Sequence, residues 1–261
     1  MSPGNRLLRL DVHVPANSTS PLPVVVFTAG GSWLLVAKNH APWLRLLDEG
    51  YAVVSVEYRL SGEARYPAQV HDIKAAVRWT RANAARFGLD PERIGAWGCS
   101  AGGYLAAMAG ATNDDPDFEG TLGEDAGQSS ALSCIITQYG PCDLLMMSRD
   151  TNGIDDASQP SCVPDSPEAQ LLGFVPSDDP DRARNASVTA HVTAATVPFL
   201  IMHGDADTML GVRQSRRLRD SLQGAGAAFE YLELPGANHG DPRFSEGEAM
   251  DIVTNFLARH L

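Results

Sequence analysis

The sequence predicts an α/β fold with a mostly parallel central sheet and helices on both of its faces. Short apolar runs of strand length alternate along the chain with segments whose apolar residues recur at helical spacing. Glycine and proline are spread over the turns between these segments and do not gather into a linker. The chain has 261 residues, 44% of them hydrophobic, so we expect residues 1–261 to form a single domain with a large core.

The expected elements follow in order along the chain. An edge strand at residues 8–14 precedes core strands at residues 24–28, 52–56, 94–98, 132–138, 199–203 and 229–234. Apolar residues at positions 70, 73, 77 and 84 predict a helix over residues 68–87. Gly88 follows this helix, and glycine readily adopts the left-handed conformation that ends many helices. Further helices are expected at residues 211–222 and 246–260.

Residues 143–196 fit no strand pattern and are expected to form an irregular insertion between two core strands. The segment carries several apolar side chains, those of Leu144, Leu145, Met146, Met147, Leu171, Leu172 and Phe174. These side chains either contribute to a substrate pocket or only hold the segment against the domain. The sequence leaves both interpretations open.

The segment Gly98–Gly102 reads Gly-Cys-Ser-Ala-Gly and lies between an expected strand and an alanine-rich helical run. In that context a G-x-S-x-G pattern is typical of a tight turn that exposes a nucleophilic serine. The amides at the start of the following helix favour negative charge nearby, as an anionic reaction intermediate requires. We therefore expect Ser100 to be the catalytic nucleophile and Cys99 to be a small packing residue.

A serine nucleophile needs a base, and the base needs an acid that orients it. Asp205 and Asp207 follow one expected strand, and His239 follows the next. The carboxyl ends of parallel strands meet at one edge of a sheet, so we expect His239 to be the base and Asp207 the acid. His203 and Asp205 are the alternatives. The place of His203 at the end of a buried strand favours a packing role, and Asp205 is a candidate for capping the loop.

These loops belong to a larger set of motifs in the same chain order. The other members are Ser55-Val56-Glu57-Tyr58-Arg59-Leu60, Tyr66-Pro67-Ala68-Gln69 with Asp72, Ala76-Val77-Arg78-Trp79, Gly88-Leu89-Asp90-Pro91-Glu92-Arg93-Ile94 and the run from Gly98 to Gly103. In this set the chain resembles α/β-hydrolase esterases of the carboxylesterase and hormone-sensitive-lipase type. It is most similar to the bacterial feruloyl-esterase-like (BD-FAE-like) group. The resemblance extends from about Leu7 to His260.

The resemblance implies the α/β-hydrolase fold, a triad of Ser100, His239 and Asp207, no cofactor, and a small-molecule carboxylic ester as the substrate. A metal site is not expected, because no pair of cysteines has ligand-like spacing beside a histidine.

One loop departs from the family pattern, which usually reads H-G-G-G-W after the first core strand. Here the loop reads Ala29-Gly30-Gly31-Ser32-Trp33, with alanine in place of the histidine and serine in place of the last glycine. Backbone amides of Gly30, Gly31 and Ala101 are expected to form the oxyanion hole, because backbone donors survive side-chain replacement. Trp33 either binds substrate or belongs to the core.

The net charge of −12 argues against binding to nucleic acid or to an anionic membrane surface, and the acidic excess is spread along the chain. The N-terminus lacks a basic region followed by an apolar core, so we expect a cytoplasmic protein. Free thiols are then expected, with a Cys142–Cys162 disulfide as the alternative. The basic cluster of Arg213, Arg216, Arg217 and Arg219 is interpreted as a solvated helix face.

The sequence as a whole predicts a serine esterase that hydrolyses carboxylic esters through an acyl-enzyme intermediate on Ser100. Two alternatives stay open. One is an acyltransferase or cyclase that uses the same triad with a bound alcohol or amine as acceptor. The other is a non-catalytic binding protein of the same fold, which only the altered loop at Ala29 favours.

Overall fold

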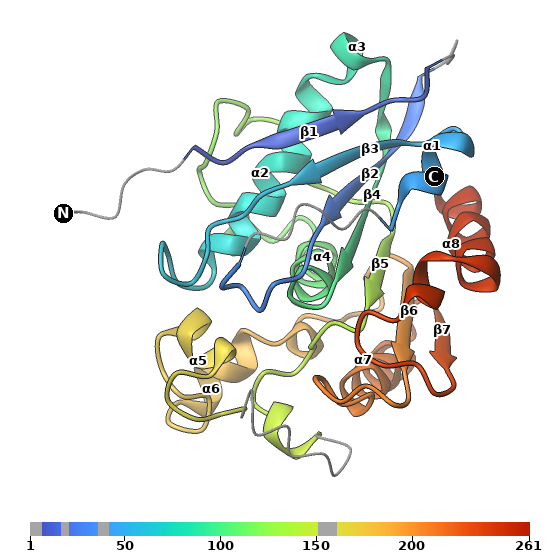
Figure 1. The fold of residues 1–261 in the computed structure, drawn as a ribbon. Helices are drawn as coiled ribbons and strands as arrows, with labels where there is room; N and C mark the ends of the chain where they lie inside the picture. Colours follow the sequence, from blue (N-terminus) through green and yellow to red (C-terminus); the bar gives the residue numbers. More distant parts are fainter. Residues whose placement is uncertain (1–6, 17–20, 36–41, 151–160) are drawn as a thin grey trace.

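The computed structural model describes residues 7–16, 21–35, 42–150 and 161–261. Within these ranges seven strands form one sheet in the order β1-β3-β2-β4-β5-β6-β7 (Figure 1). Strand β1 pairs antiparallel with β3, and every other pairing is parallel, which confirms the predicted mostly parallel sheet. The strands are β1 (Leu10–His13), β2 (Leu22–Thr28), β3 (Ala52–Val56), β4 (Leu89–Cys99), β5 (Ile135–Gln138), β6 (Phe199–Gly204) and β7 (Phe229–Leu234).

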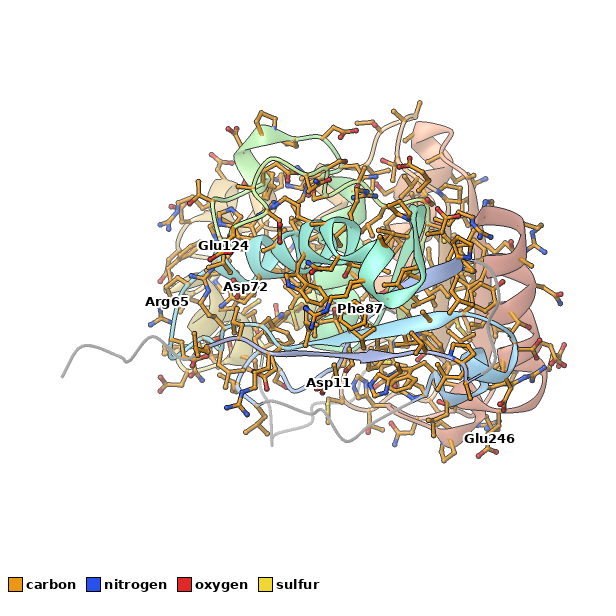
Figure 2. All side chains as sticks on the ribbon, turned by 90° about the horizontal axis from the view of Figure 1, so that it is seen from above. Asp11, Arg65, Asp72, Phe87, Glu124 and Glu246 are labelled. Atoms are coloured by element: carbon orange, nitrogen blue, oxygen red, sulfur yellow. The ribbon has the colours of Figure 1, made fainter. Side chains whose placement is uncertain are left out.

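Helices cover both faces of the sheet (Figure 1). One buried cluster joins the sheet to α2, α4 and α7, and a second joins its other face to α1 and α8. Figure 2 shows the side chains that fill the space between these layers. The helices are α1 (Leu44–Asp48), α2 (Ala68–Ala82), α3 (Ala84–Phe87), α4 (Ala101–Ala111), α5 (Pro167–Leu172), α6 (Pro180–Asn185), α7 (Arg213–Ala225) and α8 (Gly247–His260). They are joined by the 3₁₀ turns η1 (Pro116–Phe118), η2 (Met147–Arg149), η3 (Val188–Ala190) and η4 (Pro242–Ser245).

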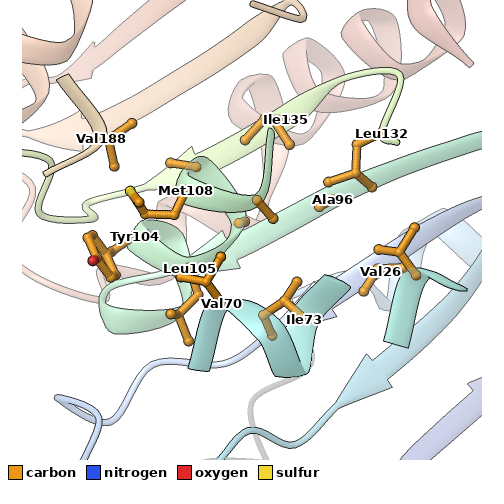
Figure 3. Close-up of a cluster of buried hydrophobic side chains, with 14 of the residues drawn as sticks. Val26, Val70, Ile73, Ala96, Tyr104, Leu105, Met108, Leu132, Ile135 and Val188 are labelled. Carbon is orange, nitrogen blue, oxygen red and sulfur yellow. The ribbon is translucent and has the colours of Figure 1, made fainter. Parts of the chain in front are cut away.

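Helix α4 is the centre of the larger cluster. All of its residues except the last are buried, as expected of a helix that is apolar on every side. Leu105 and Met108 of α4 lie in one cluster with Val70 and Ile73 of α2 (Figure 3). This packing fixes α4 between the sheet and α2, and therefore fixes the residue that precedes α4.

The observed helices and strands differ from the predicted ones mainly at their ends. The expected helix over residues 68–87 is broken at Asn83, whose backbone (φ −98°, ψ 7°) is not helical and whose side-chain amide donates to the carbonyl of Trp79. Gly88 ends α3 with a φ of 67°, which confirms the predicted left-handed cap. Strand β4 begins five residues earlier than residue 94, the expected start, and Leu89 at its start pairs with Leu22. The short helices α1, α5 and α6 have no counterpart in the prediction, and α5 and α6 lie in the segment 143–196 that was expected to be irregular.

The strand order reverses between β2 and β4, because the chain passes from β2 outward to β3 and then returns to the other side of β2. Loops that follow two such strands diverge and leave a crevice at the carboxyl edge of the sheet. In Figure 1 the parallel strands point toward the end of the molecule where α5 and α6 lie. Both helices belong to the segment 143–196, which contains no strand in its described part.

Charged residues and cysteines mostly have local structural roles. Acidic side chains such as Glu124 and Glu246 lie at opposite ends of the molecule (Figure 2), in keeping with a dispersed negative charge. The basic cluster on α7 is not simply solvated. Arg216 pairs with Glu233, Arg217 with Asp150 and Arg219 with Asp220.

All four cysteines are free thiols, so the alternative Cys142–Cys162 disulfide is not formed. Cys142 instead donates to the carbonyl of Gln214. In the described parts of the chain, no helix has the length and apolar character needed to cross a bilayer.

Candidate active site

Ser100 lies at the sharp turn between β4 and α4, as the Gly98–Gly102 motif predicts. Its φ of 54° and ψ of −125° place it in a conformation that few side chains adopt. The turn is possible because Gly102 has no side chain: a Cβ there would lie 2.1 Å from the carbonyl oxygen of Thr28. Burial raises the pKa of the neighbouring Cys99 thiol to about 12, which keeps it protonated. The turn therefore presents the Ser100 hydroxyl and an inert thiol beside it.

The structure brings Ser100, His239 and Asp207 together. His239 Nε2 lies 3.0 Å from Ser100 Oγ, and His239 Nδ1 lies 2.7 Å from Asp207 Oδ2. A carboxylate oxygen accepts, so Nδ1 carries the proton, and Nε2 is left to accept from the serine hydroxyl. The three residues come from the loops after β4, β6 and β7, all at the carboxyl edge of the sheet.

The Asp207 carboxylate is fully buried and receives four hydrogen bonds. Oδ1 accepts from the amides of Met209 and Leu210, each at 2.8 Å, and Oδ2 accepts from His239 and from His203. Burial acts to raise the pKa of Asp207, but the hydrogen bonds from the two histidines outweigh burial and hold this pKa well below the usual range. Asp207 is therefore ionised at neutral pH.

The two alternative residues occupy other positions. His203 is fully buried and bonds to groups other than Ser100; its Nε2 lies 3.1 Å from Asp207 Oδ2 and 2.9 Å from the carbonyl of Leu210. Asp205 is exposed and accepts from the amide of Gly236. The geometry thus favours His239 over His203 and Asp207 over Asp205 as partners of Ser100.

An aromatic side chain supports the His239 ring. Tyr139 lies edge to face against it, with 4.6 Å between ring centroids, and packs on its other side against Phe244. Tyr139 directly follows β5 and has a φ of 40°, which is rare for a residue with a side chain. The residues that position His239 thus come from the ends of three strands, β5, β6 and β7.

The loop expected to supply oxyanion donors lies directly over Ser100. A Cβ on Gly30 would be 2.9 Å from the Cβ of Ser100, so only glycine allows this approach. Tyr58 donates to the carbonyl of Ala29 and the amide of Ser61 donates to the carbonyl of Trp33. These two bonds hold the loop at both of its ends, including the position of Ala29, where the family has a histidine.

A cavity of about 40 Å³ opens beside Ser100. A single water needs roughly 10–15 Å³ of such space, so the cavity accommodates a group of about three or four heavy atoms. The described residues that line it are Ser32, Trp33, Ser100, Ala101, Pro141, Met147, Ser161, Pro167, Glu168, Met209, Leu210 and His239. The lining includes members of the segment 143–196, and Trp33 belongs both to the core and to this wall.

Glu168 is an unusual member of this lining. It is fully buried, its Oε1 accepts from the amide of Cys162, and its Oε2 has no hydrogen-bond partner among the described residues. Burial raises the pKa of Glu168 above its usual range. Sequence reasoning missed Glu168 because its position, the second residue of a short helix after Ser166 and Pro167, is typical of an ordinary capping residue.

Sequence reasoning also missed Tyr139 and the bond from His203 to Asp207. The signal for His203 was present, since it lies four positions before Asp207, near the end of the strand that leads into the acid loop. Tyr139 carries no such signal, because its role depends on a backbone conformation. Within the described ranges, no group of three histidine, cysteine, aspartate or glutamate side chains is placed to hold a metal ion.

A model of the BD-FAE family matches residues 10–222. Esterase LipC of Mycobacterium tuberculosis is 34% identical over 228 residues, which cover 85% of this chain and 54% of LipC. A truncated carbohydrate esterase from gut microbiota superposes with a TM-score of 0.86 at 31% identity, over 96% of this chain and 90% of that one. Esterase 2 of Thermogutta terrifontis with bound propionate superposes with a TM-score of 0.73 at 27% identity, over 99% and 90% of the two chains.

The chain spans about half the length of curated relatives such as LipC. The family model covers most of the chain, and the solved esterases share the sheet and its helices over nearly all of it. The chain belongs to the BD-FAE family and has the α/β-hydrolase fold of esterases.

Proposed function

We propose that this chain is a serine carboxylesterase that hydrolyses esters of short carboxylic acids through an acyl-enzyme on Ser100. The observation that carries the proposal is the unbroken line of contacts from Ser100 Oγ through the His239 ring to Asp207 Oδ2, at 3.0 and 2.7 Å. Each group has the protonation that the reaction needs, because the ionised Asp207 holds a proton on Nδ1 of His239.

In the first half of the reaction Ser100 Oγ attacks the ester carbonyl carbon, and its proton moves to His239 Nε2. The tetrahedral intermediate then collapses, the carbon–oxygen bond to the alcohol breaks, and the leaving alkoxide takes the proton from His239. In the second half water attacks the acyl-enzyme and gives its proton to the same nitrogen. Collapse releases the carboxylic acid and returns the proton to Ser100.

The carbonyl oxygen becomes negative in both halves and needs donors that are already in place. Ala101 is the first residue of α4, so its amide has no carbonyl within the helix to bond to. Gly30 approaches Ser100 to contact distance, which brings the loop that carries the Gly30 and Gly31 amides beside the nucleophile. We assign these three amides as the donors, and the bonds that anchor Ala29 and Trp33 support the assignment.

The small cavity favours short acyl groups, of about the size of acetate to butyrate. The structures of Thermogutta terrifontis esterase 2 with propionate and with butyrate support the same range. For the alcohol part we propose a carbohydrate, because the solved relative from gut microbiota at 31% identity is a carbohydrate esterase.

The test compares p-nitrophenyl acetate, butyrate and octanoate, then acetylated sugars, in steady state. We expect the highest kcat/KM on acetate or butyrate, and a rapid burst of p-nitrophenol that matches the number of active sites. Ser100→Ala is expected to lower kcat about a millionfold and to abolish labelling by a fluorophosphonate probe. Ser133→Ala is the matched control, since Ser133 bonds the carbonyl of Glu92 at the opposite edge of the sheet.

Retained turnover in the Ser100→Ala variant would remove this residue from the reaction. A parent protein that neither hydrolyses esters nor reacts with the probe would favour the non-catalytic alternative. Transfer of the acetyl group to an added sugar or amine in preference to water, seen in the products, would favour the acyltransferase alternative.

A further inference from the structure

We propose that His203 is a positioning residue, which shares Oδ2 of Asp207 with His239 and thereby holds the carboxylate in the place that the reaction requires. The inference deepens the proposed function, on which it rests. It assigns His203 neither to proton transfer nor to contact with the substrate, since its imidazole is fully buried and bonded on both ring nitrogens.

The surroundings of His203 determine where its proton lies. Nε2 faces two oxygens that only accept, Asp207 Oδ2 at 3.1 Å and the carbonyl of Leu210 at 2.9 Å, so Nε2 carries a hydrogen. Nδ1 lies 2.7 Å from Ser215 Oγ on helix α7. A hydroxyl can donate to this nitrogen or accept from it, so both ring nitrogens have hydrogen-bond partners.

These bonds join three parts of the structure at the carboxylate. His203 is on strand β6, Leu210 closes the acid loop, and Ser215 is on α7. Leu210 contributes twice, because its amide donates to Asp207 Oδ1 and its carbonyl accepts from His203. The bond from His203 to the carbonyl of Leu210 therefore links the two ends of the segment 203–210.

The arrangement leaves the carboxylate little freedom to rotate. Two backbone amides fix Oδ1, and two imidazoles approach Oδ2, one from strand β6 and one from the loop after β7. Without His203, Oδ2 would lose one of its two donors in a place that water does not reach, and the carbonyl of Leu210 would lose its partner. The position of Oδ2 then depends on His239 alone, although the role of the Asp207 carboxylate is to orient the ring of His239.

Two variants of His203 test this role. His203→Leu fills similar space without a donor, and His203→Gln places an amide that can donate to Asp207. We expect the leucine variant to lower kcat by about 10- to 100-fold, the scale of a small misplacement of a reacting group, with KM within about threefold. The glutamine variant is expected to retain kcat within about fivefold of the parent, because it keeps the donor. Ser215→Ala keeps the Nε2 bond and is expected to change kcat by less than about threefold.

Proton NMR supplies a readout that does not depend on turnover. The proton between His239 Nδ1 and Asp207 Oδ2 should give a resonance far downfield, absent from the His239→Ala variant. We expect this resonance to move or disappear in folded His203→Leu and to remain in His203→Gln and Ser215→Ala. If the leucine variant does not fold, the glutamine and Ser215→Ala proteins decide the matter: loss of the resonance in either one overturns the proposal.

Two further results would overturn it. One is parent-like kcat and an unchanged resonance in folded His203→Leu. The other is an equal loss of turnover in the leucine and glutamine variants with the resonance unchanged in both, which is the pattern of a packing role. Because the resonance reports the contact between Asp207 and His239 directly, its behaviour is readable even if Ser100→Ala shows that the proposed reaction is wrong.

Discussion

Two buried carboxylates near the cavity have opposite electrostatic properties. Asp207, behind His239, receives four hydrogen bonds, and its pKa lies well below the usual range although burial acts to raise it. Glu168, in the cavity lining, accepts a backbone bond from Cys162 at Oε1, its Oε2 has no partner among the described residues, and burial raises its pKa. Burial is common to both, so the number of donors sets the direction of the pKa shift.

The comparison extends to the regions that carry the two side chains. The acid loop after β6 is closed by bonds among its own residues and to a helix, and it presents a permanent negative charge to His239. The segment 143–196 forms short helices that line the cavity but contributes no residue to the contacts among Ser100, His239 and Asp207. We infer that the first region determines the chemistry and the second determines which substrates enter.

The largest difference between the two carboxylates should appear in turnover. Asp207→Asn removes the charge that fixes the proton on His239 Nδ1, and we expect kcat to fall about 10⁴-fold. Glu168→Gln removes a charge that His239 does not contact, and kcat on p-nitrophenyl acetate should change by less than about tenfold. Steady-state kinetics of the two purified variants under the same conditions measure both effects.

Asp205→Asn is the control for the aspartate variant, since Asp205 lies in the same loop but is exposed and contacts the amide of Gly236. Its turnover should stay close to that of the parent. If Asp205→Asn lost more activity than Asp207→Asn, the assignment of the acid would be wrong. Equal losses of kcat in Asp207→Asn and Glu168→Gln would contradict the inference that the acid loop determines the chemistry and the segment 143–196 does not.

Stability should respond to pH in opposite directions in the same two variants. The ionised Asp207 stabilises the fold above about pH 4, the pKa of an unfolded aspartate, and this contribution is lost as the pH falls toward the lower pKa of the folded state. The deficit of Asp207→Asn is therefore expected to be on the order of 2–3 kcal/mol at neutral pH and to shrink below about pH 4. In contrast, ionisation of Glu168 destabilises the fold, so the parent loses stability relative to Glu168→Gln as the pH rises above about 4.

Urea unfolding from about pH 3 to 8 measures the free energy of unfolding of the parent and of both variants. The difference between each variant and the parent at the same pH removes the contribution of the other titrating groups, because these groups are common to both proteins. The gain for Glu168→Gln should be about 1 kcal/mol, the scale of an incompletely satisfied buried acceptor. Parallel pH trends for the two variants would show that hydrogen bonding does not separate these carboxylates.

The strand pattern and the motifs predicted most of the fold, because the core strands are short apolar runs and their order in the chain follows a common arrangement. Ser100, Asp207 and His239 were predicted for the same reason: each lies in the loop that follows a strand at the carboxyl edge, so the order of the strands places the three loops near one another. Helix α1 was missed because it has five residues, too few to show a period.

The remaining features depend on contacts between distant residues or on backbone conformation. The break at Asn83 lies at a non-helical backbone conformation, with a φ of −98° and a ψ of 7°, and Tyr139 has a φ of 40°. Neither leaves a pattern in the sequence. The opposite properties of Asp207 and Glu168 also could not be predicted, because they depend on how many donors the folded chain places around each carboxylate.

Met147 provides the mildest test of the two regions, because it belongs to the segment 143–196 and lines the cavity without contacting the three residues that carry the proposed chemistry. Met147→Ala should enlarge the space for the acyl group and raise the ratio of kcat/KM on p-nitrophenyl octanoate to that on acetate by about tenfold, near the lower limit for a change of methylene size. Leu145→Ala is the matched control, since Leu145 packs against the same core but does not line the cavity. An unchanged ratio in Met147→Ala, or the same change in Leu145→Ala, would mean that this segment does not set the size of the acyl group. A fall in kcat on acetate as large as that of Asp207→Asn would mean that the segment takes part in the chemistry itself.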